Sequence, residues 1–142
     1  MKKLSIIYWS GTGNTEEMAN IIYESAKEQG AEVILKFVNE AALEDISESD
    51  VTALGCPAMG DEVLEESEME PFIESIEDKI SGKKLALFGS YGWGDGKWMR
   101  DWEERMSSNG AVIIHDALII NGKPESDEDT NLCREFGKSL VK

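Results

Sequence analysis

The chain has 142 residues, 41% of them hydrophobic and 30% charged, and its formal net charge is −15. This length and composition are typical of one soluble, globular domain that spans residues 1–142. The charge argues against nucleic acid or an anionic membrane as a partner, since both are bound through basic patches. It favours association with a positively charged protein surface. No apolar stretch approaches the length of a membrane span.

The apolar run that follows Lys2 and Lys3 is too short for a signal peptide. A glycine-rich loop follows it where a cleavage site would stand. Cys56 and Cys133 are far apart and match neither a disulfide framework nor a metal-ligand spacing. We therefore expect a cytoplasmic protein without a metal site.

Strand and helix patterns alternate along the chain. Strands are predicted over residues 4–9, 32–38, 51–56, 84–90 and 111–120, the last with a bend at His115 and Asp116. Helices are predicted over residues 14–29, 41–46, 68–80, 96–108 and 127–141. This alternation predicts an α/β fold in three layers, with helices on both faces of a five-stranded parallel sheet. Trp9, Trp98 and Trp102 are expected to be core or half-buried side chains.

The sequence Ser10-Gly11-Thr12-Gly13-Asn14-Thr15 stands between the first predicted strand and the first predicted helix. Glycines let such a turn curl tightly, so its N–H groups and those of the first helical residues point at one place, where the helix dipole favours an anion. The hydroxyl and amide side chains add donors. The loop contains neither Lys nor Arg, which suits a monophosphate better than a triphosphate with its metal ion. An ordinary capped strand-to-helix turn is the alternative.

Two further loops, residues 58–62 and 90–96, follow the third and fourth predicted strands. The carboxyl ends of parallel strands meet at one edge of the sheet, where ligands bind. Trp93 offers an indole that can stack on a planar ring, and Met59 offers a soft apolar side chain for the other face. Glu62 can accept a hydrogen bond from a ring N–H. Together with the first loop, these residues describe a site for a mononucleotide with a flat heterocycle.

Acidic residues dominate the middle of the chain, with no Lys or Arg before Lys79. They are Asp61, Glu62, Glu65, Glu66, Glu68, Glu70, Glu74, Glu77 and Asp78. We refer to this set as the acidic run. It is either a docking surface for a basic partner or a solvated face, and the sequence leaves both readings open.

Four segments, SGTGNT, AMGDEVLEESE, EPFIE and ALFGSYGWGDGKWMRDWEERM, stand here in the order and spacing of flavodoxins. The chain resembles this family over essentially its whole length, and specifically the short-chain type of anaerobic bacteria. The resemblance implies a flavodoxin-like parallel sheet of order 2-1-3-4-5 and non-covalent FMN as the cofactor. It also implies a monomeric electron carrier, not an enzyme, that passes one electron at a time between redox proteins.

The resemblance also implies which residues bind FMN. The phosphate would be held by Ser10, Gly11, Thr12, Gly13, Asn14 and Thr15. Met59 and Trp93 would flank the isoalloxazine, Gly60 and Asp61 would form the turn that responds to the redox state, and Glu62 would meet the ring N3. The set is completed by Ala58, Ser90, Tyr91, Gly92 and Gly94.

Pro57 departs from the family pattern, because close relatives carry a phosphate-binding Ser at this position. Proline offers neither a hydroxyl nor an N–H, so one phosphate contact is lost or replaced by water. FMN binding should survive this change, somewhat weakened. The segment 121–124 is less similar to the family, and no site residue is expected there.

The acidic residues also bear on the redox potential. One negative charge about 10 Å from the reduced, anionic flavin, at an effective dielectric constant near 40, raises the free energy of that reduced state by roughly 0.8 kcal/mol. This lowers the potential of a one-electron step by about 35 mV. Several such charges would lower the second one-electron potential by something like 100 mV. We therefore expect a low-potential carrier.

Other nucleotide-binding classes lack their signatures here. A P-loop needs Gly-Lys-Ser/Thr, and the dinucleotide fingerprint fails because Glu16 stands where a third Gly belongs. A signalling receiver needs an Asp where the chain has Cys56 and Pro57. The remaining alternative is a small FMN-dependent quinone or nitro reductase of the same fold.

Overall fold

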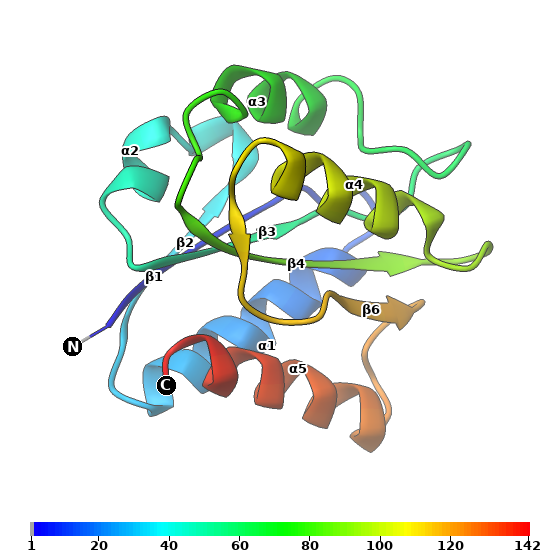
Figure 1. The fold of residues 1–142 in the computed structure, drawn as a ribbon. Coiled ribbons are helices and arrows are strands. Elements are labelled where there is room, and N and C mark those ends of the chain that lie inside the picture. Colours follow the sequence, from blue (N-terminus) through cyan, green and yellow to red (C-terminus); the bar gives the residue numbers. More distant parts are fainter. Residues whose placement is uncertain (1) are drawn as a thin grey trace.

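The computed structural model describes residues 2–142 (Figure 1). The strands are β1 (Lys3–Tyr8), β2 (Glu32–Phe37), β3 (Val51–Gly55), β4 (Lys84–Tyr91), β5 (Val112–Ile113) and β6 (Leu118–Asn121). The α-helices are α1 (Asn14–Glu28), α2 (Leu43–Ser47), α3 (Met69–Ile76), α4 (Lys97–Ser108) and α5 (Asp127–Leu140), with a 3₁₀ turn η1 (Val38–Glu40). No helix within residues 2–142 is both long enough and apolar enough to cross a membrane.

The sheet has the strand order β2-β1-β3-β4-β5, and β6 also pairs with β4. Every pairing between these strands is parallel. The carboxyl ends of the strands therefore lie along one edge, with the loops that follow β1, β3 and β4. The α/β prediction and the strand order are confirmed.

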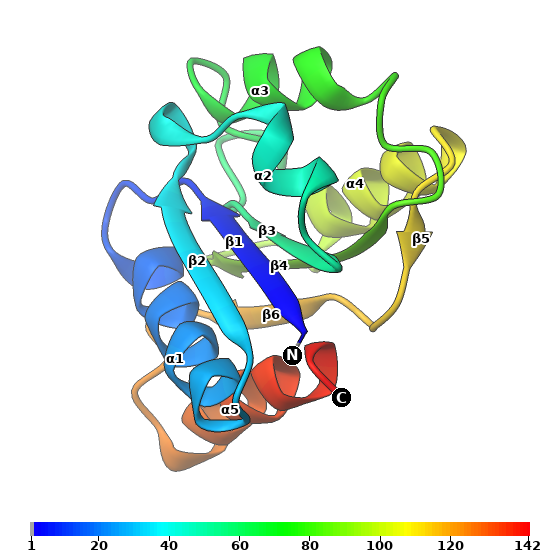
Figure 2. The same ribbon diagram turned by 90° about the vertical axis from the view of Figure 1, so that its left-hand side faces the viewer.

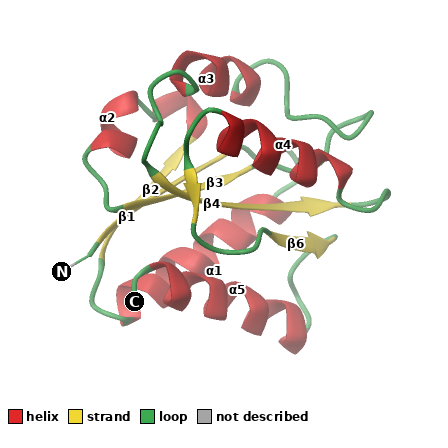
Figure 3. Ribbon diagram, viewed as in Figure 1, coloured by secondary structure: helices red, strands yellow, loops and turns green. Residues whose placement is uncertain are grey.

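Helices cover both faces of the sheet, as the red and yellow layers of Figure 3 show. α1 and α5 pack together on one face, whereas α2, α3 and α4 lie on the other (Figures 1 and 2). Side chains alternate along β1, so that Leu4 and Ile6 enter the core beneath α1 and α5, and Ile7 enters the opposite core. Both cores are fully buried, and they fix the sheet as the rigid support of the loops at its edge.

The fifth strand is not the single bent strand predicted over 111–120. β5 pairs with the start of β4, and β6 pairs with its end, from Phe88 to Tyr91. Between them His115 leaves the ladder, with its Nδ1 within 2.8 Å of the Asp116 carbonyl oxygen and its ring edge-on to Phe136. These local polar and aromatic contacts replace the ladder, so the strand is interrupted rather than bent.

The helix predicted over 68–80 ends earlier than expected. α3 stops at Ile76, and Lys79 N–H donates to the Ile76 carbonyl oxygen at 2.8 Å in a tightened turn. The other boundaries differ from the predicted ones by one or two residues, which is the usual uncertainty of helix and strand ends. One of these shifts matters for the site: Ser90 and Tyr91 belong to β4 and not to the loop after it.

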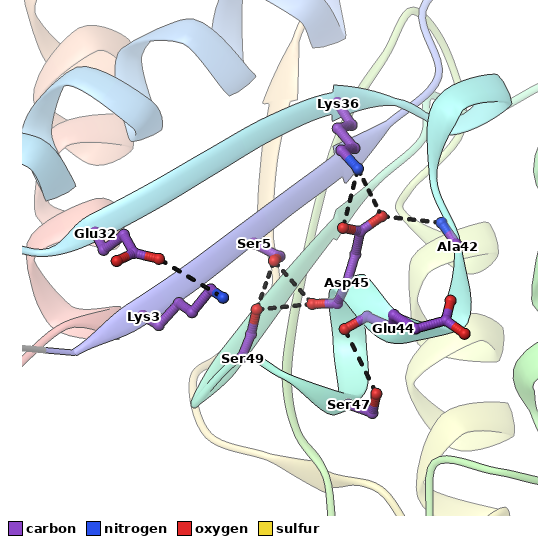
Figure 4. A network of polar contacts seen from close by, with 9 residues as sticks. All are labelled: Lys3, Ser5, Glu32, Lys36, Ala42, Glu44, Asp45, Ser47 and Ser49. Carbon is purple, nitrogen blue, oxygen red and sulfur yellow. Dashed lines mark hydrogen bonds and ion pairs between the residues drawn. The ribbon is translucent and has the colours of Figure 1, made fainter.

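Asp45 holds α2 against the sheet (Figure 4). Its carboxylate accepts the Ala42 N–H at 2.9 Å and pairs with the ammonium of Lys36 on β2 at 3.0 Å. Its backbone carbonyl accepts the hydroxyls of Ser5 on β1 and Ser49, at 2.8 and 2.7 Å. A helix of five residues is not stable alone, so these contacts supply what α2 lacks.

Candidate functional site

The loop between β1 and α1 presents a set of free N–H groups. The Ser10 hydroxyl accepts the N–H groups of Gly13 and Glu16, at 3.1 and 3.2 Å, and Gly13 adopts φ 100°. Within residues 2–142, the N–H groups of Gly11, Thr12, Asn14 and Thr15 have no hydrogen-bond acceptor. They lie at the positive end of α1, so the loop is built to bind an anion without any cationic side chain.

Tyr8 supports the first turn of α1 from inside the protein. Its hydroxyl donates to the Glu16 carboxylate at 3.1 Å. Burial raises the pKa of Tyr8 to about 12, and the hydrogen bond and charge of Glu16 add to this effect. The phenol therefore stays protonated and anchors Glu16, the residue whose N–H closes the loop on Ser10.

Trp9 forms one wall of the loop. Its indole lies against Gly11, where an added Cβ would stand 2.9 Å from the ring carbon Cη2. A side chain at position 11 would therefore displace the indole. The indole Nε1–H donates to a carboxylate oxygen of Glu68 at 3.1 Å. Trp9 is half-buried, as expected, but it faces the site rather than filling the core.

Thr15 and Ser90 form a buried pair beneath the loop. Their hydroxyl oxygens are 2.8 Å apart, and Ser90 N–H donates to the Thr15 hydroxyl at 3.3 Å. Thr15 is fully buried and Ser90 is 5% exposed. The pair fixes the start of α1 to the end of β4, and so positions the first loop relative to the third.

A cavity of about 300 Å³ lies at the edge of the sheet and joins the loops. Its lining comes from the carboxyl ends of β1, β3, β4 and β6 and the loops that follow them: Trp9, Gly11, Thr12, Asn14, Pro57, Ala58, Met59, Ser90, Tyr91, Gly92 and Gly122. The prediction that three distant loops form one site at the carboxyl edge therefore agrees with this geometry. We refer to this space as the first cavity.

The loop after β3 forms a tight hairpin-like turn. Met59 and Val63 exchange both backbone hydrogen bonds, at 3.0 and 3.2 Å. Inside this turn Gly60 has φ 27° and Glu62 has φ 56°, a left-handed conformation that is unusual for a residue with a side chain. A second cavity of about 470 Å³ lies beside the turn and is lined by Trp9, Met59, Gly60, Asp61, Val63, Glu65, Glu66 and Ser67.

Glu62 contacts the loop that carries Trp93. The Glu62 carboxylate accepts Lys97 N–H at 3.1 Å, at the start of α4. The same carboxylate lies against Gly94, where an added Cβ would stand 2.6 Å from its Oε1. The indole of Trp93 is 65% exposed, which is unusual for so large an apolar side chain. These contacts leave a flat aromatic surface at the rim of the site.

Glu65 organises the chain between this turn and α3. Its carboxylate is 5% exposed and accepts the Ser67 hydroxyl and the N–H groups of Ser67, Glu68 and Met69, the last two at 2.8 and 2.9 Å. Burial raises the pKa of Glu65, but these hydrogen bonds, first that of the Ser67 hydroxyl, outweigh burial and bring it below its usual value. Glu65 N–H in turn contacts the buried sulfur of Cys56 at 3.4 Å.

The acidic run is partly neutralised from α4. Arg105 binds both carboxylate oxygens of Glu70, at 2.9 and 2.7 Å, and reaches Glu77 at 2.8 Å. These three side chains are less than one third exposed. Together with Glu65 and Glu68, the paired residues hold the structure, whereas Asp61, Glu66 and Glu74 project into solvent.

The structure places the predicted site residues in three ways. Gly11, Thr12, Asn14, Ala58, Met59, Ser90, Tyr91 and Gly92 line the first cavity, and Met59, Gly60 and Asp61 line the second. Ser10, Gly13, Thr15, Glu62, Trp93 and Gly94 surround these cavities without lining either of them. Three residues that line the first cavity were not predicted as site residues: Trp9, Pro57 and Gly122. Gly122 follows β6, and the rule that ligands bind beyond the carboxyl ends of strands could have found it.

Comparison with known proteins gives the same picture for the whole chain. A family model described as flavodoxin matches residues 6–136. A flavodoxin of Clostridium beijerinckii is 55% identical over 138 residues, which are 97% of this chain and 99% of the relative. A flavodoxin of Megasphaera elsdenii is 45% identical over 139 residues, or 98% of each chain.

The chain belongs to the flavodoxin family. The solution structure of two-electron reduced Megasphaera elsdenii flavodoxin superposes with a TM-score of 0.88 at 44% identity, and covers 97% of this chain and 98% of that one. Flavodoxins are FMN-binding electron carriers rather than enzymes, and this flavodoxin is therefore an electron-transfer protein with FMN as its cofactor. A quinone or nitro reductase is not favoured.

The residues present fit this cofactor. The unpartnered N–H groups of the first loop suit a phosphate, because each is a donor without a competing acceptor. The first cavity is largely apolar in its lining, which includes Met59 and Gly92, the residue before the exposed Trp93, and an apolar cleft of this kind suits a flat ring system. Position 57 contributes to the lining of this cavity through a proline, without a donor.

Proposed function

We propose that residues 10–15 hold the FMN phosphate, and the four unpartnered N–H groups at the start of α1 carry this assignment. The Ser10 hydroxyl already accepts two N–H groups, so its own hydrogen is available for the phosphate. Thr15 lies beneath the loop, and its buried hydrogen bond to Ser90 holds the start of α1 in place. The phosphate is thus bound by neutral donors and the helix dipole.

The loops after β3 and β4 would hold the flavin ring. FMN supplies the redox chemistry when bound, since it accepts and releases electrons one at a time. Met59 packs on one face of the ring and Trp93 on the other, where both exclude water. Gly60 leaves the turn free to present a backbone carbonyl or N–H to the ring edge, and Glu62 accepts the ring N3–H. Ala58, Tyr91, Gly92 and Gly94 complete this pocket.

The potential is proposed to be low because uncompensated acids surround the ring site. Asp61 and Glu66 line the second cavity beside the turn, and both are exposed. Their charges oppose the addition of electrons to the bound flavin, each by an amount on the order of 35 mV at about 10 Å. Residues paired with Arg105 contribute less, because their charge is compensated.

The partners are proposed to be redox proteins with basic docking surfaces, which this flavodoxin meets as a cytoplasmic monomer. Val63 and Trp93 are exposed, and Val63 lines the second cavity together with the exposed Asp61 and Glu66. An apolar centre with an acidic rim suits a transient complex in which charge guides the encounter. The net charge of −15 disfavours nucleic acid and anionic membranes as partners.

Flavin titration tests the phosphate assignment. The protein should bind FMN at about one per chain, and bind riboflavin, which lacks the phosphate, much more weakly. Ser10→Ala removes the hydroxyl that closes the loop and should weaken FMN binding, while Ser47→Ala, on the exposed surface of α2, should not. Equal affinity for FMN and riboflavin would refute the assignment. Steady-state oxidation of NAD(P)H by the purified protein would instead indicate a reductase.

A further inference from the structure

The indole of Trp9 is held at both ends. Its six-membered ring lies against Gly11, since an added Cβ at this glycine would be 2.9 Å from Cη2 and 3.2 Å from Cζ3. Its Nε1–H donates to the Glu68 carboxylate at 3.1 Å. Trp9 is half-buried, so a shift of the ring would not be prevented by a closed core. The Glu68 contact is therefore the polar restraint on this side chain.

The backbone of Glu68 is itself fixed. Glu68 N–H donates to the buried carboxylate of Glu65 at 2.8 Å, and its carbonyl oxygen accepts Phe72 N–H at 3.2 Å in the first turn of α3. Glu68 is therefore presented from a rigid helix start rather than from a mobile loop. A fixed acceptor can hold the indole in one orientation at a small entropic cost.

Trp9 stands between the two cavities at the edge of the sheet. It lines the first cavity with Gly11 and Thr12, and the second with Met59 and Gly60. The N–H groups of Gly11 and Thr12 are among the unpartnered donors of the first loop. The orientation of the indole thus bears directly on the backbone that presents these donors.

We propose that Glu68 is a positioning residue for the phosphate side of the site. By accepting the Trp9 N–H it keeps the indole against Gly11, and so holds residues 10–13 in the conformation that binds the FMN phosphate. This rests on the assignment of residues 10–15 to the phosphate. It gives one carboxylate of the acidic run a role inside the protein instead of at a docking surface.

The hydrogen bond and the charge of Glu68 act in opposite directions. A carboxylate near the site repels the phosphate, so its removal alone should strengthen FMN binding. Loss of the hydrogen bond should weaken it. Glu68→Gln removes the charge but keeps an acceptor oxygen, whereas Glu68→Ala removes both. The comparison of these two variants isolates the hydrogen bond.

The test measures dissociation constants for FMN and riboflavin with protein freed of its flavin, by quenching of flavin fluorescence. Glu68→Ala should bind FMN about fivefold more weakly, because it loses part of what one hydrogen bond to a charged acceptor contributes. Its affinity for riboflavin should change by less than about twofold. Glu68→Gln should bind FMN as tightly as the unchanged protein, or tighter. Glu74→Ala is the matched control, because it removes an exposed acid on α3 that lines neither cavity.

Trp9→Phe tests whether Glu68 acts through Trp9. Phenylalanine keeps a ring but has no N–H, so Glu68→Ala should cause no further loss of FMN affinity in this background. Urea unfolding of each flavin-free variant reports global stability separately. Equal stability with a changed ratio of FMN to riboflavin affinity supports a local positioning role.

Two results would overturn the proposal. The first is a Glu68→Ala protein whose ratio of FMN to riboflavin affinity equals that of the unchanged protein. The second is a Glu68→Gln protein that loses as much FMN affinity as Glu68→Ala. If the unchanged protein binds riboflavin as tightly as FMN, the phosphate assignment fails and this proposal with it, which distinguishes the two failures.

Discussion

The carboxylate of Glu62 accepts the backbone N–H of Lys97 at 3.1 Å, and so ties the turn after β3 to the first turn of α4. Glu62 takes part in this contact from a left-handed conformation, with φ 56°. Its carboxylate also lies against Gly94, in the loop that carries Trp93. The two loops proposed to hold the flavin ring are therefore one mechanical unit.

Gly94→Ala should damage this unit. The added Cβ would stand 2.6 Å from Oε1 of Glu62, and Gly94 has φ 87°, a conformation that costs alanine energy. We expect the free energy of unfolding to fall by about 1 kcal/mol from the backbone alone. FMN binding should weaken by about tenfold, since Glu62 is displaced from its charged hydrogen bonds. Urea unfolding without flavin and flavin titration measure the two effects.

Gly30→Ala is the matched control for Gly94→Ala. Gly30 has φ 88°, and an added Cβ there meets no described atom within 4 Å. It follows α1, at the end of the helix away from the site. This variant should lose similar stability and keep its FMN affinity. If both variants lost the same FMN affinity, the contact between Gly94 and Glu62 would have no role in FMN binding.

The sequence predicts much of the fold because its signals are local. Mostly apolar runs such as 51–55 identify strands buried on both faces, and glycine-rich loops follow the strands at their carboxyl ends. The position of the Trp9 side chain, in contrast, does not follow from local sequence signals. It depends on the missing Cβ of Gly11 and on Glu68, 59 residues further along the chain, so the pattern around Trp9 gives no sign of it.

The acidic run shows the same limit. Read along the chain, Glu70 and Glu77 have no cationic neighbour that would neutralise them. In the folded protein Arg105 pairs with both, because α4 packs beside α3 on the same face of the sheet. Charge along the sequence therefore overstates charge at the surface, and only the three-dimensional arrangement separates structural acids from free ones.

Gly60→Val should change the redox behaviour more than the stability. A β-branched residue disfavours the conformations open to glycine at φ 27°, and limits which backbone group the turn presents to the ring. We expect the gap between the two one-electron midpoint potentials of bound FMN to narrow by about 40 mV, the equivalent of one backbone hydrogen bond. An anaerobic photoreduction titration measures both potentials.

Gly82→Val controls for backbone strain in this comparison. Gly82 has φ 81°, and no described atom lies within 4 Å of a Cβ built there. It precedes β4, at the opposite edge of the sheet from the turn. Both potentials should remain unchanged in this variant. Unchanged potentials in Gly60→Val as well would reduce Gly60 to an ordinary tight turn.

Neutralising the free acids should slow electron transfer to a basic partner. We expect the variant Asp61→Asn with Glu66→Gln to react more slowly with a small basic probe such as cytochrome c at low salt, because rim charges set the encounter rate. The difference should shrink as salt rises above about 0.1 M. Stopped-flow measurements across a salt series test this.

The same variant should have a higher second one-electron potential, which is a separate observable. A shift in potential without a change in rate would make the two acids electrostatic tuners only, and a change in rate alone would make them a docking surface. Glu28→Gln with Glu48→Gln removes equal charge from exposed positions near the opposite edge of the sheet. This control should change neither quantity, and if it matches the test variant, net charge alone is responsible.

Glu65→Gln should destabilise the protein in a pH-dependent way. The ionised carboxylate accepts N–H groups of Ser67, Glu68 and Met69, and glutamine offers one oxygen acceptor in its place. At pH 7 we expect a loss of about 2 kcal/mol in the free energy of unfolding. The hydrogen bonds bring the pKa of Glu65 below its usual value, against the effect of burial. Its contribution is therefore complete above the unfolded-state pKa, which is about 4.3, and is lost as pH falls through the folded-state pKa.

Urea unfolding at a series of pH values from 7 to 3 measures this dependence. The difference between Glu65→Gln and the unchanged protein should be constant from pH 7 to about pH 5. It should begin to narrow at about pH 4.3, where the carboxyl becomes protonated in the unfolded state, and should keep narrowing until pH has fallen below the folded-state pKa as well. Glu66→Gln, at the exposed neighbouring position, corrects for the general effect of removing one charge. A deficit that stays the same at every pH would show that glutamine disturbs packing rather than the charged hydrogen bonds. No deficit at pH 7 would mean that the start of α3 is held without Glu65.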